Sequence, residues 1–550
     1  MVRVRHLYNR IGFGATDQEV VQGLNMSPEA LVNQVVDLAI NIPLPSIPDW
    51  VNWDYDQLLS AAQCYSNGQL RYNTRDIFTT GEWLRSIAED NNRLRFKMAL
   101  FWHNHFVTEE GKYQDIVYMY NYYHKLLEYS LGNFKDFVTA MVTDKAMLSY
   151  LDGSNNQVCS PTDIPNENFA RELYELFTIG PGNYTDGGTV NDVHETARAL
   201  SGWKIKQTNL LNGWTADDRT APVYYDPTCH DNGMKTILGQ TANFDKNGVI
   251  DNLFQQKADE IATFICTKLY AEFVHPIEID SEIISEMKAT FINSSFEIEP
   301  VVRQLLKSEH FFEACYIGSK VKSPVELLTG FFIQSNLSLT DKPLYSDDDQ
   351  LPINPPPVTA GNTGGVNLGI DAPINCSSPH AFQPYSNNLY GTWVGRLSEP
   401  LNDLGQNIFN PPNVGGWPGH HACLSSSQLL GRWDSITSWV NGRLRIRQQN
   451  DLVNYVNGLC NGSIDNYEFE SIVLNHFVQR ELPFSYDRDD EQNPNTTNNE
   501  EVKTAATIFA GSFPQEEFDL DFWSWNYCDV VNQVKALIIY IIRLPAYQLH

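Results

Sequence analysis

Apolar side chains recur every three or four positions over most of the chain, and that spacing predicts amphipathic helices. The clearest segment is 93–106, which is apolar almost all round and is expected to form a central, buried helix. Ser27 followed by Pro28 marks a helix start, with Ser27 as the N-cap. Thr189 with Asp192 resembles a capping box and predicts the start of another helix. Helices are predicted within the ranges 79–130, 133–150, 167–179, 190–203, 256–274, 280–292, 298–313, 322–335, 388–405, 426–448, 466–480, 503–510 and 528–547.

The stretches that interrupt this pattern divide the chain. Short strand-like runs mixed with Gly, Asn and Asp occupy 204–250, Pro, Gly and Asn dominate 336–390, and 485–502 is acidic and Asn-rich. We therefore expect a mainly α fold: a multi-helix globular domain with long irregular loops and at most a few short strands. The expected parts are a main helical body at 1–335 that includes the 204–250 excursion, the 336–390 insert, a helical continuation at 391–484, a linker at 485–502, and C-terminal helices at 503–550 that pack back on the body.

Composition narrows the class of protein. The 550 residues include 38 basic and 67 acidic side chains, a net charge of −29. This balance excludes a general nucleic-acid binder and a protein held on an anionic membrane by a basic surface. The 42% of hydrophobic residues is enough for a core, whereas no run of about 18 apolar residues predicts a membrane span. No signal peptide is visible after Met1, so either the chain is cytoplasmic or the numbering begins after a removed leader.

Nine cysteines are dispersed without a CxxC pair, so a metal knuckle has no support. Cys266 and Cys315 lie in apolar helical contexts and are predicted to be core thiols. In an oxidising compartment, loop disulfides could form among four further cysteines: Cys159, Cys229, Cys376 and Cys423. We lean towards export, with at least one thiol left free or paired to another chain.

The first candidate constellation is His103 and His105 at the end of the apolar helix. Residues two apart point in nearly opposite directions on a helix, so the rings can converge only where the helix ends. The polar residues after Val107 favour such an end. The two rings are either satisfied by backbone or a neighbouring carboxylate, ligands of a divalent metal, or acid–base groups.

The second constellation is a polar stripe of Asn168, Arg171, Glu172 and Glu175 at i, i+3, i+4 and i+7. Glu172 and Glu175 could ligate a cation. They could equally anchor Arg171 or Arg198 in a buried ion-pair network, and we favour that structural interpretation.

Three weaker signals lie further along the chain. His194 and Arg198 share a helix face. His230 and Asp231 precede Lys235 in the irregular excursion, where they could supply a base or a phosphate contact. Trp417, in a Pro- and Gly-rich turn, could stack on a sugar or could plug the helical core.

Together these segments resemble the bacterial family known as domain of unknown function 1800. The motifs are LYNRIGFG at 7–14, FWHNHF at 101–106, NENFARELYELFTIG at 166–180, ARALSGW at 197–203, HDNGMKTILGQ at 230–240, KSPVELL at 322–328, PPNVGGWPG at 411–419 and LPAYQL at 544–549. They follow the order of the family over essentially the whole chain. The resemblance implies a mostly helical, often exported protein, often encoded beside a sulfatase-like partner, with no established activity. It also implies a shared polar set: His103, His105, Asn168, Arg171, Glu172, Glu175, Arg198, His230, Asp231 and Lys235. The chain departs from the family at Gly187-Gly188 and in the 336–390 insert, which leaves loop-borne specificity open.

Three hypotheses of function follow. The first is an exported metal-assisted hydrolase or transferase that acts on a glycan or sulfated polymer, with Glu172 or Glu175 as ligand or general base, His103 and His105 as ligands or acid, and Arg171 as an anion clamp. The second is a non-catalytic component of a surface or envelope assembly, for which an ordered oligomer is expected. The third is a carbohydrate- or peptide-binding module that uses Trp417 and the 336–390 insert.

Overall fold

The structure, a computed structural model, describes part of the chain. The described residues are 2–47, 49–52, 83, 93–113, 115–189, 191–209, 215–217, 221–334, 401, 404–417, 419, 430–432, 434 and 548–549. They are 58% helical, which confirms the mainly α fold. No helix among them is long and apolar enough to cross a membrane. The helices predicted at 466–480, 503–510 and 528–547, and nearly all of 388–405 and 426–448, lie outside the described residues, as do the 336–390 insert and the 485–502 linker.

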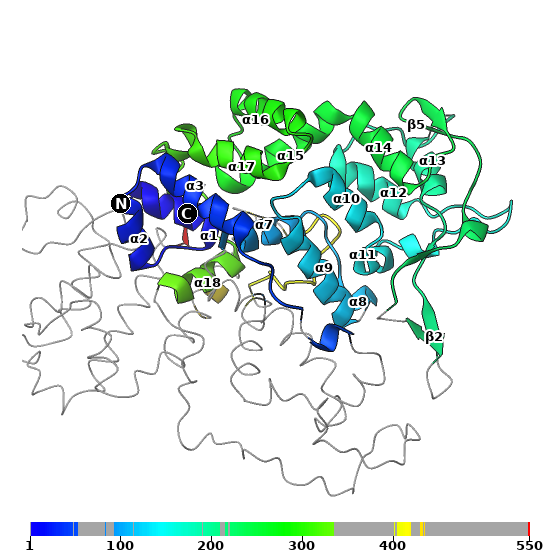
Figure 1. Cartoon of the computed structure of the whole chain (residues 1–550), viewed down its shortest axis with the longest axis horizontal. Helices are drawn as coiled ribbons and strands as arrows, with labels where there is room; N and C mark the ends of the chain where they lie inside the picture. Colours follow the sequence, from blue (N-terminus) through cyan, green and yellow to red (C-terminus); the bar gives the residue numbers. More distant parts are fainter. Residues whose placement is uncertain are drawn as a thin grey trace, which may run out of the picture.

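Helices dominate the architecture (Figure 1). The N-terminal part holds α1 (Val2–Gly12), α2 (Asp17–Leu24), α3 (Pro28–Asn41) and a 3-10 turn (Asp49–Asn52). The centre holds α7 (Arg93–His103), α8 (Glu110–Tyr113), α9 (Ile116–Glu128), α10 (Phe134–Val142) and α11 (Lys145–Tyr150), followed by a 3-10 turn (Gly153–Asn155). Next come α12 (Asn168–Glu172), a π-helix (Leu173–Thr178) and α13 (Asp192–Ala199). The last group is α14 (Lys246–Gln256), α15 (Ala258–Phe273), α16 (Ser281–Asn293), α17 (Ile298–Lys307), a 3-10 turn (His310–Phe312) and α18 (Pro324–Gln334).

The strands are short and occur where the turn-rich segment predicted them. The described residues form three two-stranded antiparallel sheets. They pair β1 (Trp203–Lys204) with β4 (Tyr224–Tyr225), β2 (Gln207–Asn209) with β3 (Thr215–Asp217), and β5 (Lys235–Ile237) with β6 (Gln240–Ala242). A 3-10 turn (Pro227–Cys229) lies between β4 and β5. The irregular excursion ends before the predicted residue 250, because Asp245 caps α14 by accepting from the Gly248 amide at 2.8 Å.

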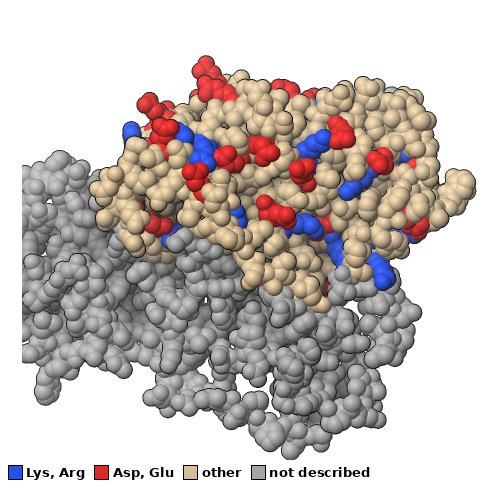
Figure 2. Space-filling model, viewed as in Figure 1, with Lys and Arg blue, Asp and Glu red and all other residues tan. Residues whose placement is uncertain are grey.

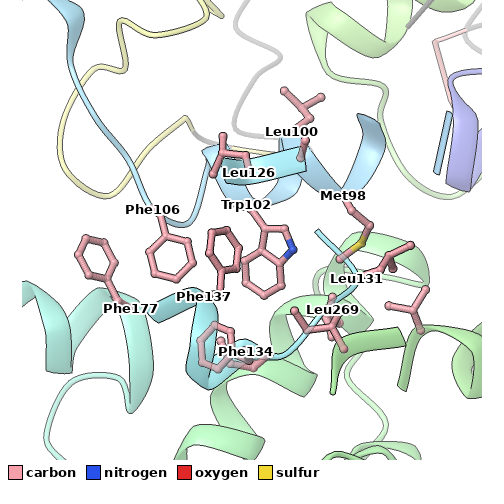
Figure 3. Close-up of a cluster of buried hydrophobic side chains, with 14 of the residues drawn as sticks. Met98, Leu100, Trp102, Phe106, Leu126, Leu131, Phe134, Phe137, Phe177 and Leu269 are labelled. Carbon is pink, nitrogen blue, oxygen red and sulfur yellow. The ribbon is translucent and has the colours of Figure 1, made fainter. Parts of the chain in front are cut away.

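The central position of α7 is confirmed. It packs against α1, α3 and α9, and α15, α16 and α17 form a layer that also reaches α3 (Figure 1). At its C-terminal end, Trp102 is fully buried, stacks on Phe134 with ring centroids 5.6 Å apart, and donates its indole N–H to the Ser130 carbonyl at 2.9 Å. Apolar side chains from α7, α9, α10, α15 and the π-helix surround this indole (Figure 3). The buried aromatic cluster therefore holds together elements that are far apart in the sequence.

Cations on α7 are buried with specific partners. Lys97 is 2% exposed and pairs with Glu326 and, at 2.5 Å, with Glu272. Burial opposes the charge of Lys97, but the two carboxylates outweigh it and raise the lysine pKa. Arg93 pairs with Glu19 at 2.8 Å and donates to the Gly14 carbonyl at 2.9 Å. The helix thus has no exposed polar face, as predicted, although three of its buried positions are basic.

Several local predictions can be compared with the capping observed. Ser27 is the N-cap of α3, as predicted. The capping box at Thr189 is wrong: Asn191 caps α13 by accepting from the His194 amide at 2.9 Å, and the Asp192 carboxylate accepts from the Thr185 amide at 2.9 Å. The predicted 133–150 helix is two helices, because Asp144 starts α11 by accepting from the Met147 amide at 3.1 Å.

The cysteines divide as follows among the described residues. Cys159 and Cys229 form a disulfide across 70 positions. Cys266 is a buried free thiol, as predicted, whereas Cys315 is exposed, so the prediction of a core thiol there was wrong. Cys376 and Cys423 lie outside the described residues.

Surface charge is mixed where it can be seen. On the face shown in Figure 2, acidic and basic side chains are interspersed over the described residues. The acidic stretches at 346–349 and 487–501 lie outside them.

Candidate functional site

The carboxylates of the second constellation lie at a change of helix type. After Glu172 the chain continues from α12 into the π-helix, where the Thr178 hydroxyl donates to the Leu173 carbonyl at 2.5 Å and the Ile179 amide donates to the Tyr174 carbonyl at 3.0 Å. π-helical turns are rare and often occur at functional sites. The wider turn moves Glu175 away from the position on the stripe that an α-helix would give it.

Glu172 and Glu175 have different surroundings. The Glu172 carboxylate is half-buried, and none of the described residues hydrogen-bonds to it. Burial, followed by the charge of Glu175, raises the pKa of Glu172. Glu175 accepts a hydrogen bond from the Tyr184 hydroxyl at 2.7 Å. Burial, Glu109 and Glu172 raise the pKa of Tyr150 to about 12, so this phenol stays protonated beside the pair.

Arg171 pairs with carboxylates other than these two. Its guanidinium contacts Asp186 and lies 3.4 Å from a Glu167 oxygen. The other Glu167 oxygen lies 2.8 Å from Nδ1 of His194. Asn168 ties the start of the helix to the preceding loop by donating to the Leu151 carbonyl at 3.2 Å. The structure therefore brings Arg171 and the two glutamates onto one short segment without pairing them.

Arg198 and Asp231 form a separate network. The guanidinium donates to both Asp231 oxygens, from Nε at 2.7 Å and from an Nη at 3.1 Å, and to Glu195 at 2.7 Å. This bidentate hydrogen bonding with Arg198 is the main cause that lowers the pKa of Asp231. Glu195 also accepts from the Thr236 amide at 3.1 Å, so the network joins α13 to β5.

Lys235 and His230 are used within the protein. The buried Lys235 ammonium donates to the carbonyls of Asp231 and Gly233 at 2.6 and 2.9 Å and to Asn243 at 3.1 Å. Nδ1 of the buried His230 lies 2.9 Å from the Ser201 carbonyl. These contacts order the loop that follows Cys229, and they engage all three N–H bonds of Lys235.

His103 is enclosed by protein. Nδ1 lies 2.9 Å from the Tyr122 hydroxyl, and Nε2 accepts from the Phe409 amide at 3.0 Å. Because Nε2 accepts, Nδ1 carries the proton and donates to Tyr122. Burial lowers the pKa of His103 to about 3, so the ring is neutral.

His105 lies beyond the end of α7 and faces other partners. Its Nε2 donates to the Phe177 carbonyl at 3.0 Å, and its Nδ1 accepts from the Lys268 ammonium, also at 3.0 Å, because an ammonium can only donate. Burial, and then the charge of Lys268, lowers the pKa of His105 well below its usual value. Neither imidazole is hydrogen-bonded to Glu172 or Glu175. Among the described residues, no three His, Cys, Asp or Glu side chains converge as a metal site requires, and metal ligation by His103, His105 and Glu172 stays a prediction.

Trp417 matches the core-filling alternative. Its side chain is 7% exposed and its ring centroid lies 5.0 Å from that of His103. Asn104 Oδ1 accepts from the Trp417 amide at 2.7 Å and occupies the space beside Gly416 that a Cβ would need. With its ring turned inward, Trp417 offers no exposed face for stacking on a sugar.

Three residues at or near the site were missed from the sequence. Tyr184 and Asp186 lie in a glycine-rich loop with no helical pattern, and Lys268 is a single cation in an apolar helix. Only the structure shows that Tyr184 reaches Glu175 and that Lys268 reaches His105. A lysine within an otherwise apolar helical run was the available signal for the last of these.

The fold and the site define a mainly helical protein with a carboxylate pair where α12 passes into a π-helix, Glu172 at the end of α12 and Glu175 on the π-helix. The chain belongs to the family described as protein of unknown function DUF1800, whose model matches residues 6–549. No curated protein and no solved structure matches the chain.

Proposed function

We propose that the protein is an exported hydrolase that uses Glu172 and Glu175 as an acid–base pair on a glycan substrate. The observation that carries this proposal is the different surroundings of two neighbouring carboxyl groups. Glu172, at the end of α12, is half-buried, whereas Glu175, on the π-helix, accepts a hydrogen bond from the Tyr184 hydroxyl. Acid–base hydrolysis needs two neighbouring carboxyl groups in different surroundings, because one must donate a proton while the other accepts one.

The surroundings suggest the two roles. Glu172, whose pKa is raised by burial and by Glu175, is suited to hold a proton and deliver it to a leaving group. Glu175, which accepts a hydrogen bond from the Tyr184 hydroxyl at 2.7 Å, is suited to accept a proton from the attacking water. Arg171 lies on the same segment and would hold an anionic group of a substrate, although Asp186 and Glu167 share its charge.

The cellular location is also a proposal. The Cys159–Cys229 disulfide supports an oxidising compartment, because structural disulfides are rare in reducing cytosol. A glycan or sulfated polymer outside the cytosol would be accessible there. A sulfatase-like partner, expected from the family resemblance, would fit a substrate that carries sulfate.

The test is reducing-end release from a panel of neutral, acidic and sulfated glycans by wild-type protein and by Glu172→Gln and Glu175→Gln. We expect release from one class and a loss of about 100-fold or more in each variant, the range attributed to acid–base groups. Glu286→Gln, at an exposed position on α16, is the matched control and should keep full activity. The proposal is wrong if the wild type releases nothing or if both variants stay active. Metal analysis of the active protein, purified without chelator, would show whether a divalent ion assists.

A second candidate is the non-catalytic assembly protein. The observation that favours it is that Arg198, Asp231 and Lys235 are engaged in intramolecular bonds, as in a structural network. Arg171→Ala separates the two candidates. A structural role predicts a large drop in melting temperature, whereas the enzyme predicts lost activity with an intact fold. A discrete oligomer in light scattering would support the assembly protein.

A further inference from the structure

A pocket separate from the carboxylate pair lies where the π-helix ends. It has a volume of about 370 Å³, within the range of small-molecule sites. One wall is the segment 179–183, and the other is a face of α15 that presents Asp259, Glu260, Thr263, Phe264, Thr267 and Lys268.

Lys268 brings an unbalanced positive charge to this pocket. Its ammonium donates to Nδ1 of His105 at 3.0 Å and lies 4.7 Å from the centroid of the Phe264 ring. Among the described residues no carboxylate lies within 4 Å of it, and the imidazole it contacts is neutral. Burial lowers the pKa of Lys268 to about 8, which leaves the side chain mainly protonated at neutral pH.

The carboxylates of the pocket are balanced elsewhere. Asp259 pairs with Lys288 at 2.8 Å, and Glu260 pairs with Lys257 at 2.8 Å. Asp259 and Glu260 lie nine and eight positions before Lys268 on α15, about 12–14 Å away along the helix axis. The pocket is therefore cationic at the Lys268 end and balanced at the other.

We propose that this pocket binds a small carboxylate-bearing molecule whose anionic group pairs with Lys268. His105, held by the Phe177 carbonyl, orients the Lys268 ammonium. The two remaining N–H bonds of this ammonium have no acceptor among the described residues. Ile179, Pro181 and Phe264 supply apolar contacts for the body of the ligand, and Thr263 and Thr267 supply hydroxyls. A single ammonium matches a monoanion. A phosphate dianion would leave one of its two charges without a cationic partner, because Lys268 is the single cation among the lining residues.

The binding test uses the full chain and saturation-transfer NMR with glucuronate, glutamate and benzoate, with glucose as an uncharged probe and inorganic phosphate as the alternative anion. We expect at least one carboxylate to bind, glucose to bind at least tenfold more weakly, and Lys268→Met to weaken the carboxylate at least tenfold. Lys307→Met removes a partly exposed lysine of α17 and should change nothing.

A second variant guards against a folding defect in Lys268→Met. Thr263→Phe fills the pocket from an exposed position on α15, keeps Lys268, and should also abolish binding. The proposal is overturned if no carboxylate binds, or if binding survives both Lys268→Met and Thr263→Phe. Binding of phosphate alone, lost in Lys268→Met, would overturn the carboxylate assignment in favour of a phosphate site.

Discussion

Nζ of Lys268 lies 3.0 Å from Nδ1 of His105, and this hydrogen bond joins a surface pocket to the aromatic core. Because the Lys268 ammonium can only donate, Nδ1 of His105 accepts, Nε2 carries the proton that it donates to the Phe177 carbonyl, and the imidazole is neutral. The π-helix, the end of α7 and α15 therefore meet at one ring. This arrangement makes the neutral form of His105 part of the folded state.

The first prediction is that the protein loses stability as the pH falls below about 6.5. Burial lowers the pKa of His103 from 6.5 to about 3 and lowers that of His105 well below 6.5. Between the unfolded and folded pKa values only the unfolded chain binds these protons. The contribution of the two neutral rings to the free energy of unfolding is therefore fully present above pH 6.5 and is lost progressively as the pH falls towards the folded pKa values. Each ring lowers the free energy of unfolding by up to about 1.4 kcal/mol per pH unit.

Denaturant unfolding of wild type and His103→Gln between pH 5 and 7.5 measures this effect. The variant can still accept from the Phe409 amide but does not titrate, so its stability should depend less steeply on pH. His275→Gln, at a partly exposed ring, is the control. An equal slope in wild type and His103→Gln would contradict the prediction.

The spacing of apolar residues predicted the helices well, because an amphipathic helix buries one face and a central helix such as α7 is buried all round. The all-apolar pattern of 93–106 identified α7 as central, and Ser27-Pro28 identified the start of α3. Breaks that depend on one side chain were missed. Asp144 splits the predicted 133–150 helix, and Asn191 takes the cap expected at Thr189.

The candidate site was predicted less completely, because its geometry depends on long-range contacts. The sequence placed Glu172 and Glu175 on one segment, but no local signal marks the π-helix that repositions Glu175. The expected pairing of these glutamates with Arg171 or Arg198 does not occur, since Asp186 and Asp231 take the two arginines. Asp186 and Asp231 lie in loops that only folding brings close to Arg171 and Arg198.

The second prediction concerns the disulfide. Removing it with Cys159→Ser and Cys229→Ser should lower the free energy of unfolding by about 4 kcal/mol, as loop entropy predicts for a bond across 70 positions. Denaturant unfolding of the double variant and of wild type with and without reductant gives the value. Cys315→Ser, at an exposed free thiol, should leave stability unchanged. If the reductant has no effect on the wild type, the bond does not stabilise the fold.

The third prediction uses two glycines that follow the π-helix. Gly180 and Gly182 both have positive φ, 75° and 83°, so alanine at either position costs about 1 kcal/mol or more in backbone strain. A Cβ on Gly180 would also lie 3.0 Å from the Phe264 ring, whereas one on Gly182 would meet nothing within 4 Å. Gly180→Ala should therefore destabilise the protein more than Gly182→Ala. Equal melting temperatures would show that the Phe264 ring moves freely.

The fourth prediction is that Arg198→Lys loosens the segment from Asp231 to Ile237. Lysine cannot reproduce the two parallel bonds to Asp231 together with the bond to Glu195, so we expect a loss of about 1–3 kcal/mol. Hydrogen exchange of the β5 amides should accelerate in the variant. Arg303→Lys is the control, because Asp37, one of its partners, is more than half exposed and such pairs contribute little. If both variants exchange alike, Arg198 is not what orders this segment.

The last prediction is that Glu172→Gln stabilises the protein at neutral pH while removing its activity. A carboxyl group whose pKa is raised in the folded state favours folding below its unfolded pKa and opposes folding once the pH exceeds the folded pKa. The neutral amide removes that opposition, and the gain should be about 0.5–2 kcal/mol, as is common when a functional site is relieved of strain. The two melting curves should converge at pH 4, where the wild-type carboxyl is protonated. Glu175→Gln should give a smaller gain, because it removes the charge of Glu175 but leaves burial, the larger cause of the raised pKa of Glu172. A Glu172→Gln variant that melts below the wild type at pH 7 would instead mean that Glu172 holds the fold together, as the assembly protein requires.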